Sequence, residues 1–362
     1  MNQSAIEVER PSGHGRQSSH CEAEVAGMTG RPQHRKKLPK VGVVAIGRNE
    51  GERLKKCLDS VVGIADHVVY VDSGSTDDSV EMAHARGVTV VELDTRIPFR
   101  AGRARNEGFR RCRELAPDLA YVLFVDGDCE VAVGWIEKGT EFLDAHRDIA
   151  VVCGRRRERY PEQSIYNMLI AIEWDSHPLG EARACGGDAL MRVAAFAATD
   201  GYRADMMAGE EPELSFRLRA AGWRIWFLDT PMTLHDAAMT RFSQWWKRAL
   251  RSGYGVANNA YLHGAPPEYY AVRAWFSGWF WGLGIPVGAL GLVPWWGGWS
   301  LALLLLYPLQ LIRIAMRGRH SPRENWWNAL FLVLDRFPQM LGQLKFLVHR
   351  CLGSQPRLIT YK

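Results

Sequence analysis

The sequence predicts an α/β domain with a mostly parallel sheet, followed by a C-terminal helical region that associates with a membrane. Between residues 40 and about 240, apolar runs of strand length alternate with segments whose apolar residues have helical spacing. Strands that alternate with helices are typical of a parallel sheet covered on both faces. Between Ala274 and Ile312, 39 consecutive residues carry no charge, which is enough for two helices across a bilayer.

The expected strands of the α/β domain are short and apolar. They are VGVVAI (41–46), HVVYVD (67–72), VTVVEL (88–93) and AYVLFVD (120–126). The first helix is expected in NEGERLKKCLDSVVG, whose leucines and valines recur at helical spacing. The second helix is expected to begin at Ser75, with Asp78 completing a capping box. Two of these strands therefore end in an aspartate.

The uncharged stretch predicts a membrane hairpin. Two transmembrane helices are expected at about 274–293 and 298–316, joined by the turn PWWGGW (294–299). Arginines stand on both flanks, which places both flanks in the cytoplasm under the positive-inside rule. An interfacial helix is expected at about 326–348, with a third span as the alternative. A buried helix pair of a soluble protein is the competing interpretation of the hairpin.

The remaining segments complete the expected domain organisation. Residues 1–38 lack periodicity and are interpreted as a disordered basic tail, 39–240 as the catalytic domain, and 351–362 as a second tail. Residues 241–270 are expected to be an amphipathic interfacial segment, in which Trp245, Trp246 and Arg248 contact an anionic membrane surface. The membrane region then covers 271–350. A net charge of only +5 does not indicate nucleic-acid binding.

The sequence VDGD places Asp126 and Asp128 at the end of an apolar strand. Ligands bind at the carboxyl ends of strands in open parallel sheets. The repulsion between two neighbouring carboxylates is tolerable if a divalent cation neutralises it. Mg²⁺ and Mn²⁺ favour oxygen ligands and bridge carboxylates to phosphates. The pair therefore suits a metal that holds a diphosphate, and a solvated Asp/Gly turn is the alternative.

Two further segments favour a nucleotide site. In VDSGSTDDS (71–79), Asp72 ends a strand beside a Gly/Ser turn that leads into a helix, which is suited to an anion or nucleotide. In RIPFRAGRARNEGFR (96–110), Arg100, Arg103 and Arg105 surround a glycine, and arginine suits phosphate through its planar fork. Ordinary helix capping and a solvated basic helix face are the respective alternatives.

Together these segments resemble the family 2 glycosyltransferases of the GT-A fold. The resemblance covers roughly residues 41–250 and includes VVAIGRNEGERLKKCLDSV, VDSGSTDDSVEMA, RARNEG, LFVDGDCE and GGDALMRVAAFAATDGYRADMMAGEEPELSFRLRAAGWRIWFLD. It implies inverting transfer from a nucleotide-diphosphate sugar. It assigns nucleotide and donor contacts to Asp72, Arg48, Glu50, Arg103, Asn106, Asp126 and Asp188.

The resemblance also assigns the metal and the catalytic base. Asp126 and Asp128 match the family's Asp-x-Asp motif, and His235 is a candidate for a third metal ligand. An acceptor hydroxyl must lose its proton as it attacks, and a positioned carboxylate is a suitable base. Glu210 and Glu211 match the family's acidic pair, in which the second acid is usually the base. Because that second acid is usually Asp, the choice between these two residues stays open.

We therefore expect a metal-dependent enzyme at the inner (cytoplasmic) membrane, multi-pass, with its catalytic domain facing the cytoplasm. Its expected cofactor is Mn²⁺ or Mg²⁺, and its expected donor a UDP-sugar by default. The expected acceptor is a lipid-linked saccharide of surface or exopolysaccharide assembly. Direct transfer to polyprenyl phosphate and a processive synthase are alternatives within the family. A haloacid-dehalogenase-like phosphatase and a non-catalytic membrane scaffold are alternatives of other classes.

Overall fold

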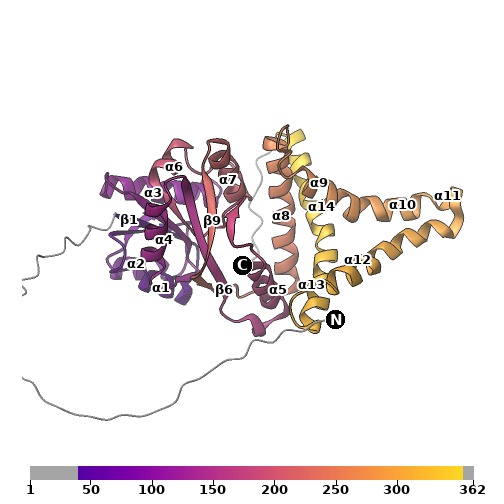
Figure 1. Cartoon of the computed structure of the whole chain (residues 1–362), viewed down its shortest axis with the longest axis horizontal. Coiled ribbons are helices and arrows are strands. Elements are labelled where there is room, and N and C mark those ends of the chain that lie inside the picture. The colour runs from indigo at the N-terminus through magenta and orange to yellow at the C-terminus, as the bar shows by residue number, and fades with distance from the viewer. Residues whose placement is uncertain (1–39, 354–362) are drawn as a thin grey trace, which may run out of the picture. The chain divides into compact units, whose positions relative to one another are not determined.

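The computed structural model describes residues 40–353 (Figure 1). The expected tail at 1–38 lies outside the described residues, as does nearly all of the expected tail at 351–362. The described residues belong to one compact unit by their internal contacts. An α/β layer and a set of C-terminal helices are the two parts of this unit.

A nine-stranded mixed sheet forms the centre of the α/β layer, in the order β3-β2-β1-β4-β8-β6-β9-β5, with β7 also paired to β9. The first four strands of this order run parallel, whereas β8 is antiparallel to both of its neighbours. The strands are β1 (Val41–Gly47), β2 (His67–Asp72), β3 (Thr89–Glu92), β4 (Tyr121–Asp126), β5 (Cys129–Val131), β6 (Ile149–Glu158), β7 (Gly180–Ala182), β8 (Ala189–Arg192) and β9 (Arg224–His235). This architecture confirms the α/β fold class, with a mixed sheet.

Helices connect these strands. They are α1 (Glu52–Asp59), α2 (Ser79–Ala85), α3 (Ala101–Leu115), α4 (Trp135–Ala145), α5 (Ile165–Asp175), α6 (Val193–Ala198) and α7 (Glu210–Ala220). The expected start of α2 at Ser75 is wrong, because the helix begins four residues later and its N-cap is Asp78. The Ser75 hydroxyl and backbone N–H instead donate hydrogen bonds to Asp72, which keeps this segment in a turn.

The helix α3 packs directly on β1 and β2 through a glycine. A Cβ atom at Gly108 would lie 2.3 Å from Val44 and 2.8 Å from Val71, so only a residue without a side chain permits this approach. Gly108 lies one turn after Arg105, which is buried at 2% relative exposure. The close packing thus fixes the position of Arg105 beneath the carboxyl edge of the sheet.

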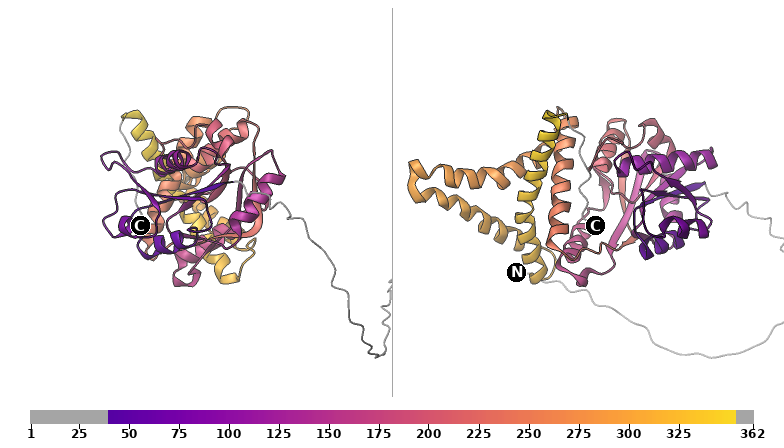
Figure 2. Two further views of the ribbon diagram at one scale, coloured as in Figure 1. Left: turned by 90° about the vertical axis from the view of Figure 1, so that its left-hand side faces the viewer. Right: turned by 180° about the vertical axis from the view of Figure 1, so that it is seen from behind.

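The C-terminal helices begin with α8 (Phe242–His263), which packs along α14 (Arg336–Cys351). A Cβ atom at Gly253 would lie 2.1 Å from the Gln339 carbonyl oxygen, and one at Gly342 would lie 2.0 Å from that of Leu250. The two helices therefore approach each other closely through glycines. Figure 1 and Figure 2 show α8 between the sheet and α14.

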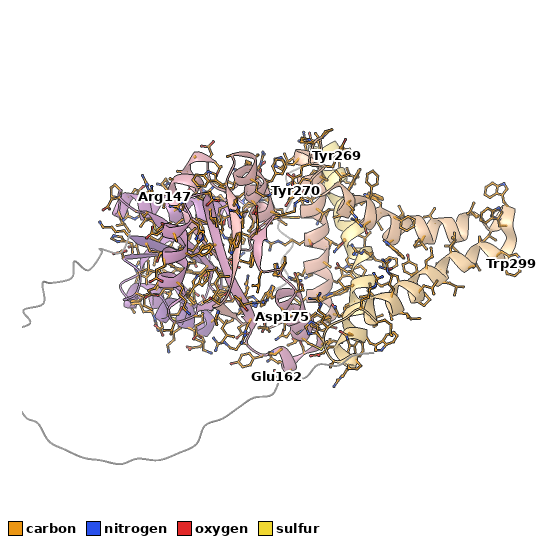
Figure 3. The ribbon with its side chains drawn as sticks, in the orientation of Figure 1. Arg147, Glu162, Asp175, Tyr269, Tyr270 and Trp299 are labelled. Atoms are coloured by element: carbon orange, nitrogen blue, oxygen red, sulfur yellow. The ribbon has the colours of Figure 1, made fainter. Side chains whose placement is uncertain are left out.

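A helical hairpin projects from the α8–α14 pair (Figure 1, Figure 2). Its segments are α9 (Val272–Trp279), a π-helical turn (Phe280–Gly284), α10 (Ile285–Gly291), α11 (Val293–Trp296), a 3₁₀ segment (Gly297–Leu305) and α12 (Leu306–Ala315). Trp299 stands at the tip, far from the sheet (Figure 3). The predicted turn at 294–299 thus coincides with the tip of the hairpin.

The hairpin exposes large apolar side chains. Trp295, Trp296 and Trp299 are 77%, 62% and 86% exposed. Among residues 40–353, one segment is long and apolar enough to cross a membrane, Val293–Ala315, and only 11% of its apolar window is buried. The sequence predicts a second span at 274–293, and that arm is not among the candidates found.

The expected interfacial helix at 326–348 consists of two helices. They are α13 (Pro322–Leu334) and α14, and they meet at Asp335. The Ser321 hydroxyl caps α13, and its backbone N–H donates to Glu324 in a capping box. Trp326, Trp327 and Leu332 of α13 are partly exposed.

Candidate active site

The carboxyl ends of β1, β2 and β4 meet at one edge of the sheet, because of the strand register. Gly47 lies opposite Asp72, and Ile46 lies opposite Asp126. The sequence-predicted aspartates that end two strands are thereby brought to the same edge, where open parallel sheets bind ligands.

Asp72 is buried and its carboxylate is engaged by its own loop. It accepts hydrogen bonds from the Tyr70 hydroxyl at 2.9 Å and from the backbone N–H groups of Gly74 and Ser75 at 2.8 Å each. These bonds hold the turn that follows β2. The direct partners of Asp72 are therefore protein groups, and Asp72 fixes the shape of the loop.

Arg105 is the centre of the site. Its guanidinium donates to Asp126 at 2.9 Å, to Glu210 at 3.1 Å and to Glu211 at 3.2 Å. Asp126 ends β4, whereas the two glutamates form the first turn of α7, so a single side chain joins two elements that are distant in sequence. The planar fork of arginine suits such a bridge. Gly187 leaves the space beside this cluster open, since a Cβ there would lie 3.0 Å from Asp126.

Glu211 has the pKa of a general base that operates near neutral pH. Burial of the side chain and the charge of Glu210 raise its pKa from 4.5 to about 7, and Arg105 partly offsets the increase. The side chain remains 20% exposed, so a ligand can reach it. The helix α7 begins at Glu210, so Glu210 and Glu211 both lie in its first turn.

A buried chain of polar side chains surrounds Asp128. The Nε2 atom of His235 lies 3.3 Å from an Asp128 oxygen, and its Nδ1 atom lies 3.0 Å from Glu158. Sheet register causes this arrangement, because His235 on β9 pairs with both Cys129 on β5 and Glu158 on β6. Burial lowers the His235 pKa, but the charge of Asp128 and the hydrogen bonds to Asp128 and Glu158 together outweigh it, so the pKa is raised.

Asp128, Cys129 and His235 form a group that can hold a metal ion, since one ligand atom of each lies within 4.8 Å of the others. Carboxylate oxygen and imidazole nitrogen suit Mn²⁺, and Mg²⁺ favours the oxygen. Burial raises the pKa of the Cys129 thiol well above its usual value, which keeps it protonated and a weak ligand. Asp126 is outside this group.

Asp188 joins the two carboxylate clusters. One oxygen accepts the Asp126 backbone N–H at 3.0 Å, and the other accepts the Thr233 hydroxyl at 2.8 Å. Arg156 lies 3.4 Å from Asp188 and 3.6 Å from Asp126, and its guanidinium covers the ring of Trp174 at 4.4 Å. Asp188 thus joins the end of β4 to Arg156 and β9.

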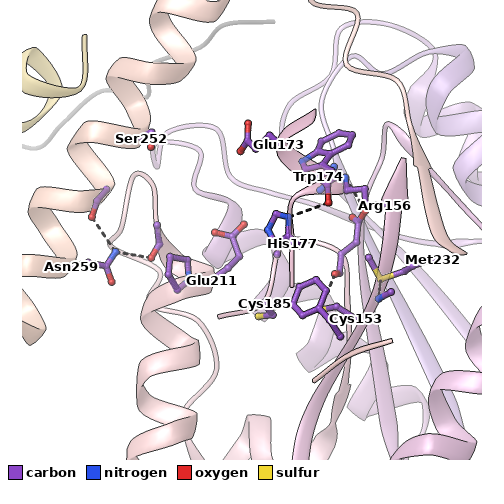
Figure 4. Close-up of a pocket in the computed structure, with 18 of the residues that line it drawn as sticks. Cys153, Arg156, Glu173, Trp174, His177, Cys185, Glu211, Met232, Ser252 and Asn259 are labelled. Carbon is purple, nitrogen blue, oxygen red and sulfur yellow. Dashed lines mark hydrogen bonds and ion pairs between the residues drawn. The ribbon is translucent and has the colours of Figure 1, made fainter. Parts of the chain in front are cut away.

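Three cavities meet at Glu211. The loop cavity, about 540 Å³, includes Arg48, Glu50, Asp126 and Glu211 in its lining. The cleft, about 480 Å³, lies between β6, α5 and α8, and Figure 4 shows Glu211 projecting into it. The helix cavity, about 700 Å³, lies between α5, α8 and α13. Glu211 lines all three cavities, so groups bound in different cavities can meet there.

The other residues that the sequence predicts to contact the nucleotide sugar do not all lie at the same cavity. Arg48 and Glu50 line the loop cavity, and Arg48 also lines a smaller neighbouring cavity together with Arg103. Asn106 lies elsewhere: its amide donates to the Tyr202 carbonyl at 2.7 Å and accepts the Tyr202 N–H at 2.9 Å. Asn106 therefore holds the loop before α7.

The expected membrane-contacting residues of α8 contact protein. Trp245 is only 8% exposed and packs edge-on against Phe331 at 4.8 Å. Arg248 forms a bidentate pair with Glu173 at 2.8 and 3.0 Å. Trp246 is partly exposed. In this structure Trp245 and Arg248 therefore join α8 to α5 and α13 and do not form an open surface.

Comparison with known families agrees with this geometry. Residues 43–243 match the model of the glycosyl transferase family 2, which is more than half of the chain. The chain belongs to glycosyl transferase family 2. The Asp126–Asp128 segment, Asp188, the acidic start of α7 and His235 all lie within the matched range.

Relatives of this family 2 glycosyltransferase include a protein named for succinoglycan biosynthesis and one named as a glycosyltransferase. It is 25% identical to the succinoglycan biosynthesis protein ExoA of Rhizobium meliloti over 59% of this chain and 67% of that protein. It is 29% identical to the glycosyltransferase AglE of Haloferax volcanii over 34% of this chain, and the match spans only 41% of AglE.

A solved structure shares the fold. The mannosyltransferase PcManGT of Pyrobaculum calidifontis, determined in complex with GDP-Man and Mn²⁺, matches 86% of this chain and 88% of its own. The TM-score is 0.52 and the identity is 17%. The likeness supports the GT-A fold of this family 2 glycosyltransferase.

The sequence alone did not single out three residues of the site. Arg105 stood among three candidate arginines, and Arg103 was favoured. Arg156 and Glu158 are on β6, in the charged run RRRE (155–158), which has no motif that distinguishes a buried side chain from a solvated one. Glu158 is identified by its position opposite His235 on the neighbouring strand. This pairing is visible only in the sheet register, not in the sequence.

Proposed function

We propose that this protein is an inverting glycosyltransferase that moves a sugar from a nucleotide-diphosphate sugar, by default a UDP-sugar, to a hydroxyl of a lipid-linked saccharide. The observation that carries the proposal is Glu211, a carboxylate with a pKa of about 7 at the meeting point of three cavities. A general base is most effective when its pKa lies near the working pH.

In this mechanism the acceptor oxygen attacks the anomeric carbon and its proton passes to Glu211. The bond between the anomeric carbon and the diphosphate oxygen breaks, and the nucleoside diphosphate leaves with the electron pair. Arg105 holds Glu211 and Asp126 in fixed positions for this step. Glu210 contributes charge that keeps the pKa of Glu211 high.

A divalent cation, Mn²⁺ or Mg²⁺, fits the residues around Asp128. Asp128 and His235 would hold it, and Asp126 would complete the site with the donor diphosphate. Glu158 accepts the Nδ1–H of His235, which leaves Nε2 as the ligand atom. When bound, the cation stabilises the charge that develops on the leaving diphosphate.

We further propose that the hairpin inserts into the inner (cytoplasmic) membrane from the cytoplasmic side. Both arms would enter the bilayer, and the exposed tryptophans at the tip would reach the far interface. The arginines after α12 would stay in the cytoplasm with the catalytic domain. This placement brings the active site to the leaflet that carries lipid-linked saccharides.

The test is a screen of the purified protein in detergent with a panel of sugar nucleotides. Release of nucleoside diphosphate is measured with and without EDTA, and in Glu211→Gln and Asp128→Asn variants. Release that requires metal and both side chains, with the sugar appearing on a lipid-linked saccharide, supports the proposal. Transfer only to a water-soluble sugar, or undiminished transfer by both variants, contradicts it.

A further inference from the structure

The helix cavity has an apolar end and a charged end. Its apolar wall is formed by Leu169 and Ile170 of α5, Trp245 of α8, and Phe331 and Leu332 of α13. Four of these side chains pack together in one buried cluster, and Leu332 is the exception. A volume of about 700 Å³ is typical of a ligand site. The cavity is therefore suited to a molecule with a long apolar part.

The charged end of the helix cavity reaches the catalytic groups. Its charged lining consists of the carboxylates Glu173, Glu210, Glu211 and Asp335 and of Arg248 and Arg251. Arg251 also lines the loop cavity, so its positive charge lies where the two cavities meet. Arg248 pairs with Glu173, and Arg105 pairs with both Glu210 and Glu211, so three of these four carboxylates contact an arginine.

Part of the cavity lining on α13 is exposed. Leu332 lines the cavity and is 39% exposed, which places it at the mouth. Trp326 and Trp327, earlier on the same helix, are 46% and 38% exposed. The helix α13 packs on α12, the second arm of the hairpin, so this part of the lining lies near the hairpin. A lipid in the same membrane can enter here without crossing water.

We propose that the helix cavity binds the prenyl chain and diphosphate of the lipid-linked acceptor, with the chain between α5 and α13 and the diphosphate near Arg248 and Arg251. This inference rests on the proposed function and specifies how its acceptor is bound. An amphiphile bound this way presents its first sugar at Glu211. The nucleotide sugar occupies the loop cavity, so the two substrates reach Glu211 from opposite sides. A water-soluble acceptor makes no use of the apolar end.

Farnesyl diphosphate is the probe, because it combines a short prenyl chain with the anionic group. Its binding to the purified full-length protein in detergent is measured by isothermal titration calorimetry, with farnesol and inorganic diphosphate as separate ligands. We expect Leu332→Asp to weaken farnesyl diphosphate binding at least tenfold, because it places a negative charge at the apolar mouth. Leu341→Asp is the matched control, since Leu341 is 38% exposed on α14 and outside the cavity lining. We expect its affinity to stay within twofold of wild type.

Arg251→Gln tests the charged end. We expect it to weaken farnesyl diphosphate at least fivefold and to leave farnesol binding unchanged. Equal losses in Leu332→Asp and Leu341→Asp, or equal affinity for farnesol and farnesyl diphosphate, overturn the inference. The outcome is separable from that of the proposed function, because binding requires no turnover. If sugar transfer to lipid is found but the variants bind the probe alike, only the inference fails. If the binding pattern is found without sugar transfer, the proposed function fails.

Discussion

Replacing Glu211 with glutamine should stabilise the folded protein at neutral pH while it removes activity. The pKa of Glu211 rises from 4.5 to about 7 on folding, and one pKa unit corresponds to about 1.4 kcal/mol. Ionising Glu211 therefore costs the folded state up to about 3 kcal/mol. Between pH 4.5 and 7 the folded state binds more protons than the unfolded state, so this contribution to stability is lost as the pH rises.

Glutamine does not titrate, so the stability of the variant does not depend on the ionisation of residue 211. The free energy of unfolding of Glu211→Gln, minus that of the wild type, should grow by about 3 kcal/mol from pH 4.5 to 7 and stay constant above. Burial of the side chain contributes most to this raised pKa, and the charges of Glu210, Arg105 and Asp126 modify it. Unfolding is followed by tryptophan fluorescence with urea in detergent and EDTA. In the same variant, turnover should fall about 10²–10⁴-fold.

A control with the opposite sign comes from Glu114 at the exposed end of α3. Its pKa is lowered by a hydrogen bond from Arg111, so Glu114→Gln should not gain stability as the pH rises. If the unfolding free energies of Glu211→Gln and the wild type stay parallel from pH 4.5 to 8, the raised pKa is wrong. The assignment of Glu211 as the base then loses its main support.

Three further predictions follow from the contacts of the site and of the C-terminal helices. Glu158→Gln should weaken Mn²⁺ binding about 10–100-fold in equilibrium titrations without substrate, whereas Glu162→Gln on the surface should not. Arg105→Lys cannot bridge three carboxylates, so it should lower stability by about 3 kcal/mol and shift the acid limb of the pH–rate profile to higher pH. Gly342→Ala should lower stability by about 1–3 kcal/mol because its Cβ would meet the α8 backbone, whereas Gly298→Ala has open space and should be neutral. Unchanged affinity, an unshifted profile, or equal melting temperatures for the two alanine variants would contradict the respective argument.

The strand ends of the fold could be predicted because a local signal defines them. Apolar runs that stop at Asp72 and Asp126 place both aspartates at strand ends, and the parallel register brings these ends to the same edge of the sheet. The hairpin tip was predictable for the same reason, since the charge-free stretch is interrupted by PWWGGW. The start of α2 could not be predicted, because Ser75 can either cap a helix or close a turn. Its hydrogen bond to Asp72 selects the turn.

The partners of buried charges could not be predicted, because they depend on distances between elements. Arg105 meets Asp126, which is 21 residues away, and Glu210 and Glu211, which are 105 and 106 residues away. In the sequence, Arg103 and Arg105 are equivalent members of a basic segment. The helical turn beneath Gly108 directs only Arg105 toward the sheet edge.

The charge balance around Arg105 supports the proposal that this part of the site serves ligand binding and catalysis. Asp126, Glu210 and Glu211 share Arg105 as their common partner, and Arg156 reaches only Asp126 among them, at 3.6 Å. Buried ion pairs contribute little to stability, and an excess of buried carboxylates reduces it. The raised pKa of Glu211 is the measure of that cost. Such a cluster is unfavourable for the fold by itself, whereas a divalent ion and a cationic transition state both gain from it. The arrangement is therefore better explained by ligand binding and catalysis than by folding.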